Sequence, residues 1–253
     1  MMKIAAMSVL LLGATASVFA APTNAFVRPD AAMQAIIGHA TKQLFQARTD
    51  ADASQVVQTL AQKGTNETQL VEQVLYFLRH GITTEEQGYG AIILVNKLPV
   101  DRQRKAETAV AYLDTSDKDT RKIVEDFLDA ASTLPGNKRD FSALETILRQ
   151  KQPDVPSVLV AFMYRHDPKA AVLSMSRVYG NKADETEVSD KIKDDPKVAL
   201  QSLSDRPEWW AHLYVAETMK KQPQVRDAAL LKKLEKDDTP LVKEKVAEIT
   251  SGK

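Results

Sequence analysis

Hydrophobic residues return every three or four positions through most of this chain, which is the spacing of amphipathic α-helices. In the segment 29–46, for example, the residues at helical spacing are Met33, Ile36, Ile37, Ala40 and Leu44. Capping residues, glycines and prolines separate such segments and mark their ends. In the first half this pattern predicts a helix over 29–46 and a second one that ends near Gly64, marked by Val56, Val57, Leu60 and Ala61. Further helices are predicted from Asn66 to Gly81, from Thr83 or Thr84 to Leu98, after Asp101, and after Asp117 or Asp119.

Residues 134–140 form the clearest break between two halves, because turn-forming Pro, Gly and Asn residues gather there. Beyond the break the same spacing predicts helices from Phe141 to Pro153, from Val155 to Arg165, from Asp167 to Tyr179, and from Asp195, Pro207, Pro223 and Pro240 onwards. The polar segment 180–187 is expected to be a connector. The whole pattern predicts about thirteen helices and no strand.

A helix-opening motif occurs twice near the C-terminus. Asp205-Arg-Pro-Glu-Trp-Trp and Asp238-Thr-Pro-Leu-Val-Lys share an Asp-x-Pro-x-apolar core and lie about 33 residues apart. A related pair, Asp167-Pro-Lys-Ala-Ala-Val-Leu-Ser and Asp195-Pro-Lys-Val-Ala-Leu-Gln-Ser, also opens helices. In each of these two segments we expect Asp to accept hydrogen bonds from free backbone N–H groups, and Pro stands in the first turn, where its missing donor costs nothing. Recurrence at this period is typical of stacked helical repeats. We therefore expect an all-α fold, a right-handed α-solenoid of stacked antiparallel helix pairs over residues 29–253.

The C-terminal third resembles the HEAT-repeat superfamily. The resemblance rests on Asp238-Thr-Pro-Leu-Val-Lys-Glu-Lys-Val-Ala-Glu-Ile and on Pro223-Gln-Val-Arg-Asp-Ala-Ala-Leu-Leu-Lys-Lys-Leu. Both segments match the family's order of Pro, Val, a basic residue and then small and apolar residues one turn later. The resemblance implies paired antiparallel helices that stack into a curved rod and bind partners, usually proteins. It implies no particular activity. A tetratricopeptide array is the competing fold, but its aromatic and small-residue spacing is not repeated here.

The first twenty residues have the form of a secretory signal peptide. Lys3 supplies a positive region, Ile4 to Ala14 form an apolar core, and Val18-Phe19-Ala20 fits the small-residue cleavage pattern. We expect cleavage after Ala20, a linker over 21–28 and a periplasmic or secreted mature protein, with an uncleaved anchor as the alternative. No later apolar stretch is long enough to cross a bilayer, so no membrane span is expected in the mature chain.

Composition removes several classes of function. Lys and Arg together number 34, as do Asp and Glu, and a chain without net positive charge is a poor candidate for binding nucleic acid. Cysteine is absent, which excludes disulfides, thiolate metal sites and cysteine nucleophiles. The four histidines never pair at the spacing of a helical metal site. We therefore expect no metal, no cofactor and no catalytic residues.

Two short motifs resemble binding loops but have simpler interpretations. Asp114, Asp117 and Asp119 are spaced like calcium ligands, yet they lack the glycine and distal Glu of a calcium loop, and helix capping explains them equally well. Gly88-Tyr-Gly90 has no preceding strand and no third glycine, so close packing of helices is its expected role rather than phosphate binding.

Two clusters are candidate contacts for a partner. Trp209 aligns with Val225 and Val242 and should be core, whereas Trp210 aligns with exposed cations; we expect Trp210 to be partly exposed and to form a contact surface with Arg206 and His212. The alternative is that a neighbouring repeat covers Trp210.

The second cluster lies at a helix end. Tyr164-Arg165-His166 repeats the arrangement of Tyr76-Phe-Leu-Arg79-His80, with cations beside free backbone carbonyls. Capping of the helix end is the simpler interpretation. An anion-binding corner that contacts a partner is the alternative, and Tyr164, Arg165 and His166 are its candidate residues.

Together these features favour an exported scaffold or adaptor that binds a protein or peptide. An enzyme or enzyme subunit acting in the cell envelope is the alternative, and a purely structural helical repeat is a third reading. The sequence does not name the partner or the oligomeric state.

Overall fold

A computed structural model describes residues 26, 28–63, 66–134, 136, 138–150 and 157–252. Within these ranges the chain forms fourteen α-helices, one short 3-10 helix and two strands of two residues each, so the all-α prediction is confirmed. The expected signal peptide, the cleavage after Ala20 and most of the linker fall outside the described residues.

The first half contains six helices. They are α1 (Ala31–Gln46), α2 (Asp50–Ala61), α3 (Glu67–His80), α4 (Glu85–Lys97), α5 (Arg102–Val110) and α6 (Lys118–Ala131). The second half contains α7 (Ser142–Gln150), α8 (Ser157–His166), α9 (Pro168–Tyr179), α10 (Lys182–Lys191), α11 (Pro196–Ser204), α12 (Trp209–Lys221), the 3-10 helix η1 (Pro223–Val225), α13 (Ala228–Leu234) and α14 (Pro240–Thr250).

Local capping chemistry sets many of these boundaries. Asn66, Asp167 and Asp195 each accept a hydrogen bond from a backbone N–H in the following turn, as the sequence predicts. Of the alternatives, the structure selects Thr84 as the cap of α4 and Asp117 as the cap of α6. Capping involves residues two or three positions apart, which explains why sequence alone located these ends.

Two helix predictions are wrong. The supposed connector 180–187 belongs largely to α10, which Asn181 and Asp184 open with a reciprocal capping box. Only Val188 of α10 is buried, so this helix has no apolar stripe to reveal it. The helix expected from Pro223 is a 3-10 turn, and α13 begins later, at Ala228, where Asp227 supplies the cap.

The predicted break at 134–140 coincides with a small hairpin, so the expectation of no strand is also corrected. Strands β1 (Thr133–Leu134) and β2 (Lys138–Arg139) pair antiparallel, with Thr133 opposite Arg139. Gly136 between them has a φ of 79°, which only glycine adopts readily. The halves are tied across this hairpin, because Arg102 forms a 2.7 Å ion pair with Asp140 and α5 packs on α7.

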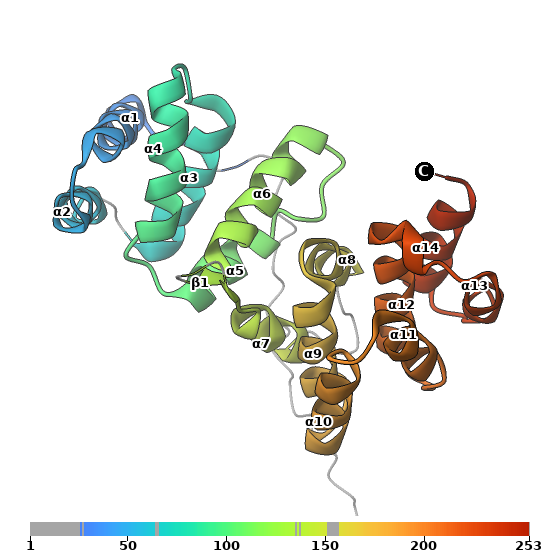
Figure 1. Ribbon diagram of the computed structural model, residues 1–253. Coiled ribbons are helices and arrows are strands. Elements are labelled where there is room, and N and C mark those ends of the chain that lie inside the picture. Colours follow the sequence, from blue (N-terminus) through green and yellow to red (C-terminus); the bar gives the residue numbers. More distant parts are fainter. Residues whose placement is uncertain are drawn as a thin grey trace, which may run out of the picture.

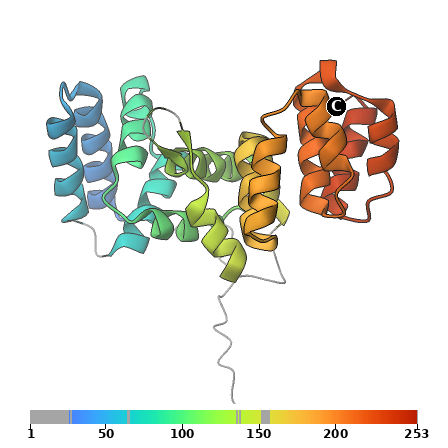
Figure 2. The same ribbon diagram turned by 60° about the horizontal axis from the view of Figure 1, so that its bottom comes forward.

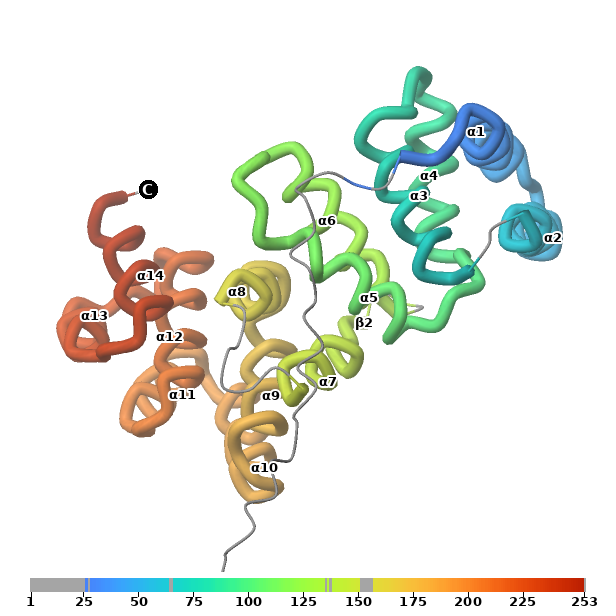
Figure 3. Tube along the Cα trace, turned by 180° about the vertical axis from the view of Figure 1, so that it is seen from behind, coloured from blue at the N-terminus to red at the C-terminus, as the bar shows by residue number. Residues whose placement is uncertain are grey.

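The helices follow one another along an elongated arc, from α1 and α2 at one end to α13 and α14 at the other (Figure 1). The view from behind shows the same order (Figure 3), and a tilted view shows the long dimension of the molecule (Figure 2). Helices that pack extensively on each other lie within four helices of one another in chain order. One apolar core still runs through the described chain, from Phe26, which contacts the ring of Tyr112 at 5.0 Å, to Ile249.

Candidate functional site

Trp210 is buried, which contradicts its expected exposure. Trp210 is only 2% exposed, whereas Trp209 is half-buried. The reason is that α12 is surrounded: α8, α9, α11, α13 and α14 all pack against it. The alignment of Trp209 with Val242, taken from the shared Asp-x-Pro motif, also fails. The helix α12 begins at Trp209, two residues after Pro207, whereas α14 begins at Pro240 itself. Trp210 is therefore a core residue, and only an edge of it lines the open pocket beside Trp209.

Arg206 is held inside the protein by its own ion pairs. Its guanidinium lies 2.6 Å from Asp184, 2.7 Å from Glu187 and 2.9 Å from Glu208, and stands 5.4 Å from the centroid of the Trp210 ring. The side chain is 9% exposed. The pKa of Asp184 is lowered by hydrogen bonds from the Asn181 backbone and from Arg206. Arg206 thus joins α10 to the start of α12.

His212 is likewise engaged within the fold. Its Nδ1 contacts a carboxylate oxygen of Asp237, and its Nε2 lies 2.7 Å from the carbonyl oxygen of Arg206. Burial alone would raise the pKa of Asp237, but hydrogen bonds from His212 and from Thr239 lower it. Both ring nitrogens of His212 therefore face acceptors of this chain.

The second predicted cluster is also structural. Tyr164 is 1% exposed, Arg165 forms a 2.7 Å ion pair with Glu125, and Nδ1 of His166 lies 2.7 Å from Asp129. These contacts join the end of α8 to α6. Arg79, in the matching motif of α3, pairs with Asp119 at 3.0 Å, so it too reaches α6. Tyr164, Arg165 and His166 therefore connect helices, and only Arg165 keeps much of its side chain on the surface.

Half-buried Trp209 lines an open pocket of about 510 Å³ with Tyr179. The two rings meet edge to face at 5.7 Å. The carboxylates that share this pocket already have cationic neighbours: Glu208 pairs with Arg206 and Asp238 with Lys243. The pocket has an aromatic wall, and the carboxylates of Glu208 and Asp238 that line it are already paired with cations of this chain.

A different surface stands out by its exposure. Among the described residues five large hydrophobic side chains are exposed, and four of them lie on α4, on the loop before it and on the neighbouring part of α1. These four are Phe45 (45% exposed), Ile82 (39%), Tyr89 (54%) and Ile92 (59%), and we call them the α4 patch. The fifth, Val198, lies on α11. A cluster of exposed apolar side chains, unlike scattered ones, is typical of an interaction surface.

The close packing of α1 on α4 creates this patch. A Cβ atom at Gly90 would lie only 1.8 Å from the carbonyl oxygen of Thr41, so the two helices approach as closely as they do because residue 90 is glycine. The buried face of α4 includes Ala91, Leu94 and Val95, which leaves Tyr89 and Ile92 on the opposite side. Tyr89 stacks on Phe45 of α1, with ring centroids 6.2 Å apart.

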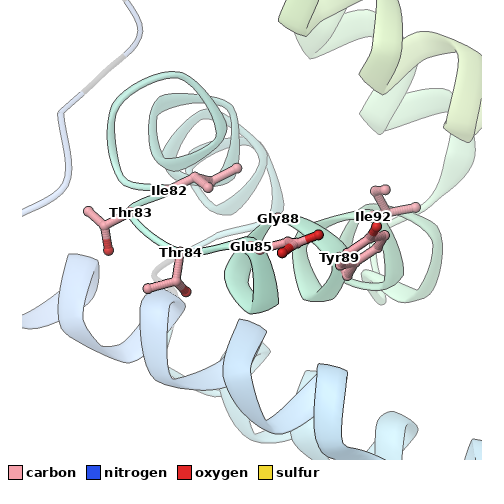
Figure 4. Close-up of a pocket in the computed structure, with 7 residues that line it drawn as sticks. All are labelled: Ile82, Thr83, Thr84, Glu85, Gly88, Tyr89 and Ile92. Carbon is pink, nitrogen blue, oxygen red and sulfur yellow. The ribbon is translucent and has the colours of Figure 1, made fainter.

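The patch borders an open pocket of about 500 Å³ at the start of α4 (Figure 4). Tyr89 and Ile92 lie together at one end, Ile82, Thr83 and Thr84 lie at the other, and Glu85 and Gly88 lie between them. Thr84 caps α4, and the backbone N–H of Thr83 donates to Gln87 at 3.0 Å, which fixes the loop that carries Ile82. The site therefore has a rigid frame and an apolar wall.

The pocket is lined by three large hydrophobic side chains, two threonines, one glycine and one carboxylate, that of Glu85. In the described part of the chain no three His, Asp or Glu side chains gather in a way that could hold a metal ion. Of the helices that the structure describes, none is both long and apolar enough to cross a membrane. Comparison with known protein families, with characterised proteins and with solved structures finds no match to this chain.

The sequence predicts that Gly88-Tyr-Gly90 serves the close packing of helices. Of the two glycines, only Gly90 lies at such a contact. A Cβ atom at Gly88 would meet nothing within 4 Å. The signal that could have revealed the patch is the run Ala91-Ile-Ile-Leu-Val, which makes α4 apolar on more than one face. Because Leu94 and Val95 suffice for the core face, Ile92 is in excess of what packing requires.

Proposed function

We propose that this protein is an exported helical-repeat scaffold or adaptor, located in the periplasm, that binds a protein partner through the α4 patch. The proposed architecture is a right-handed α-solenoid of the HEAT type. It is supported by the elongated arc and by the packing of each helix on helices close to it in the chain.

One observation carries the proposed binding role. Four of the five exposed large hydrophobic side chains among the described residues gather in one place, and three of them line an open pocket of about 500 Å³. Exposing this apolar area to water is unfavourable, at roughly 25 cal/mol for each Å². A partner that covers the patch would recover that free energy.

Crosslinking in intact cells tests the binding role. A photoreactive amino acid placed at residue 92 should form one discrete adduct, and an added Tyr89→Glu substitution should abolish it. The same probe at Val198, which is also exposed at 57%, serves as the matched control and should give no such adduct. Equal adducts from both positions would contradict binding through the α4 patch.

Export is tested separately by fractionation and intact-mass measurement. The protein should appear in the periplasmic fraction with Ala21 as its first residue. Recovery of the uncleaved chain with membranes would contradict both the cleavage and the location.

A further inference from the structure

Four exposed side chains of α4 form a stripe along one face of the helix. Glu85, Tyr89, Ile92 and Asn96 are all exposed and follow one another at intervals of four, three and four residues. Residues at this spacing lie along one face of a helix. The stripe has two large apolar residues in the middle and a polar residue at each end, which is the pattern of a face that packs on a second helix.

Gly88 adds a notch beside this stripe. Unlike Gly90, whose missing side chain makes room for Thr41, Gly88 has open space where its Cβ would stand. The fold makes no use of the small size of residue 88. Because Gly88 lines the pocket between Ile82 and Tyr89, the open space can accept one apolar side chain from outside.

The charge of the site indicates the charge expected of the partner segment. Glu85 lines the pocket, and Glu86 beside it is exposed. Neither forms an ion pair within the described part of the chain, and no Lys or Arg lines the pocket. Lys97, at the other end of α4, is already paired with Asp50 at 3.0 Å. A basic residue of a partner therefore finds unpaired carboxylates at the start of α4.

We propose that the α4 patch docks an amphipathic helix of a partner protein. The apolar residues of that helix, spaced three and four apart, pack on Tyr89 and Ile92, and one of them enters the notch over Gly88. A Lys or Arg of the same helix faces Glu85. This inference rests on the proposed function and adds the conformation and charge of the partner segment.

A displayed library of random peptides, selected on the full-length protein, tests the proposal. Enriched peptides should share apolar residues at helical spacing and carry an excess of Lys and Arg. Ile92→Glu should abolish their binding, and Val198→Glu should not. Glu85→Lys should weaken binding of the basic peptides by about tenfold.

Gly88→Leu separates docking from stability. Leucine fills the notch, so binding should weaken by about tenfold or more. Replacement of a helical glycine by leucine favours the helix, and a Cβ at residue 88 meets nothing within 4 Å, so the melting temperature should stay the same or rise. Loss of binding together with an unchanged or higher melting temperature cannot come from unfolding.

Other outcomes have distinct meanings. Peptides that depend on Ile92 but lack helical spacing, or that ignore Gly88→Leu, overturn the helix and leave the proposed function standing. If the selection yields no peptide whose binding depends on Ile92, the result counts against both the docked helix and the proposed function. If sedimentation shows a dimer of the wild-type protein that Ile92→Glu dissociates, a second copy of this chain occupies the patch and the proposal is wrong.

Discussion

The hydroxyl of Tyr164 donates a 2.7 Å hydrogen bond to the backbone carbonyl oxygen of Trp210. The two residues are 46 positions apart in the chain, and both are buried. The bond joins α8 to the first turn of α12, and burial raises the pKa of Tyr164 well above its ordinary value, so the hydroxyl keeps its proton and remains a donor. Sequence reasoning placed these two residues in separate contact surfaces, but they belong to one interior contact.

Tyr164→Phe should therefore lower the free energy of unfolding by about 1 kcal/mol, because it removes one buried hydrogen bond and leaves a carbonyl with fewer donors. Urea unfolding followed by circular dichroism measures the change. Tyr89→Phe is the control, since Tyr89 is exposed, and it should change stability by less than about 0.5 kcal/mol. Equal effects of the two substitutions would show that the Tyr164 hydroxyl contributes nothing.

Substitution of Trp210 by Ala should cost more stability than substitution of Trp209, which is the reverse of the order expected from the sequence. Trp210→Ala removes a buried aromatic side chain from the middle of the helix cluster and should cost roughly 3–5 kcal/mol. Trp209→Ala should cost less, about 1–2 kcal/mol, because Trp209 is half-buried and loses less apolar contact. Unfolding must be followed by circular dichroism, since each variant lacks a tryptophan. A larger effect at Trp209 would contradict the register of α12.

Asp237 should make the protein sensitive to acid. Its pKa in the folded protein lies below the ordinary value of 3.8, so as the pH falls through this range the unfolded chain takes up a proton before the folded one does. The stabilisation is therefore present above the ordinary pKa and is lost as the pH drops towards the lowered one. Asp237→Asn should cost on the order of 1 kcal/mol near neutral pH. The difference in free energy of unfolding between Asp237→Asn and wild type should become smaller as the pH falls.

Stability measured in urea from about pH 7 down to about pH 3 checks this dependence. Asp238→Asn is the matched control next in the chain, because the side chain of Asp238 is fully exposed and its pair with Lys243 lies on the surface. A difference between Asp237→Asn and wild type that does not change with pH would contradict the assignment.

Lys105 should weaken the fold at neutral pH. The residue is 4% exposed, and burial, together with the nearby charge of Arg102, lowers the pKa of its amine to about 8 from 10.5. Between these two values the unfolded chain binds more protons than the folded one, so stability rises with pH across this window. Lys105→Met should be more stable than wild type at neutral pH by an amount on the order of 2 kcal/mol.

The difference between Lys105→Met and wild type should narrow between pH 8 and pH 10.5, where the wild-type amine becomes neutral. The bond from the Lys105 amine to the carbonyl oxygen of Val95, at 3.3 Å, is lost in the variant and offsets part of the gain. A variant that is less stable than wild type at every pH would show that this bond outweighs the cost of burying the charge.

Features that depend on neighbours in the chain could be predicted from sequence. Asn66, Asp167 and Asp195 cap helices through hydrogen bonds that span two or three residues, so their roles follow from the local pattern alone. The all-α class follows from apolar spacing summed over many such segments. Where the spacing signal is absent, as in α10 with its single buried residue, the same reasoning misses a helix.

Burial and exposure were decided by tertiary structure. Trp209 and Trp210 are adjacent, and whether each is covered depends on how the neighbouring helices α8, α9, α11, α13 and α14 pack around α12. In the same way, the sequence makes α4 apolar on two faces, but only the approach of α1 over Gly90 determines that Ala91, Leu94 and Val95 face the core and that Tyr89 and Ile92 face water. Helix formation is a local process governed by short hydrogen bonds, whereas coverage of a side chain depends on residues that the chain brings together only after it has folded.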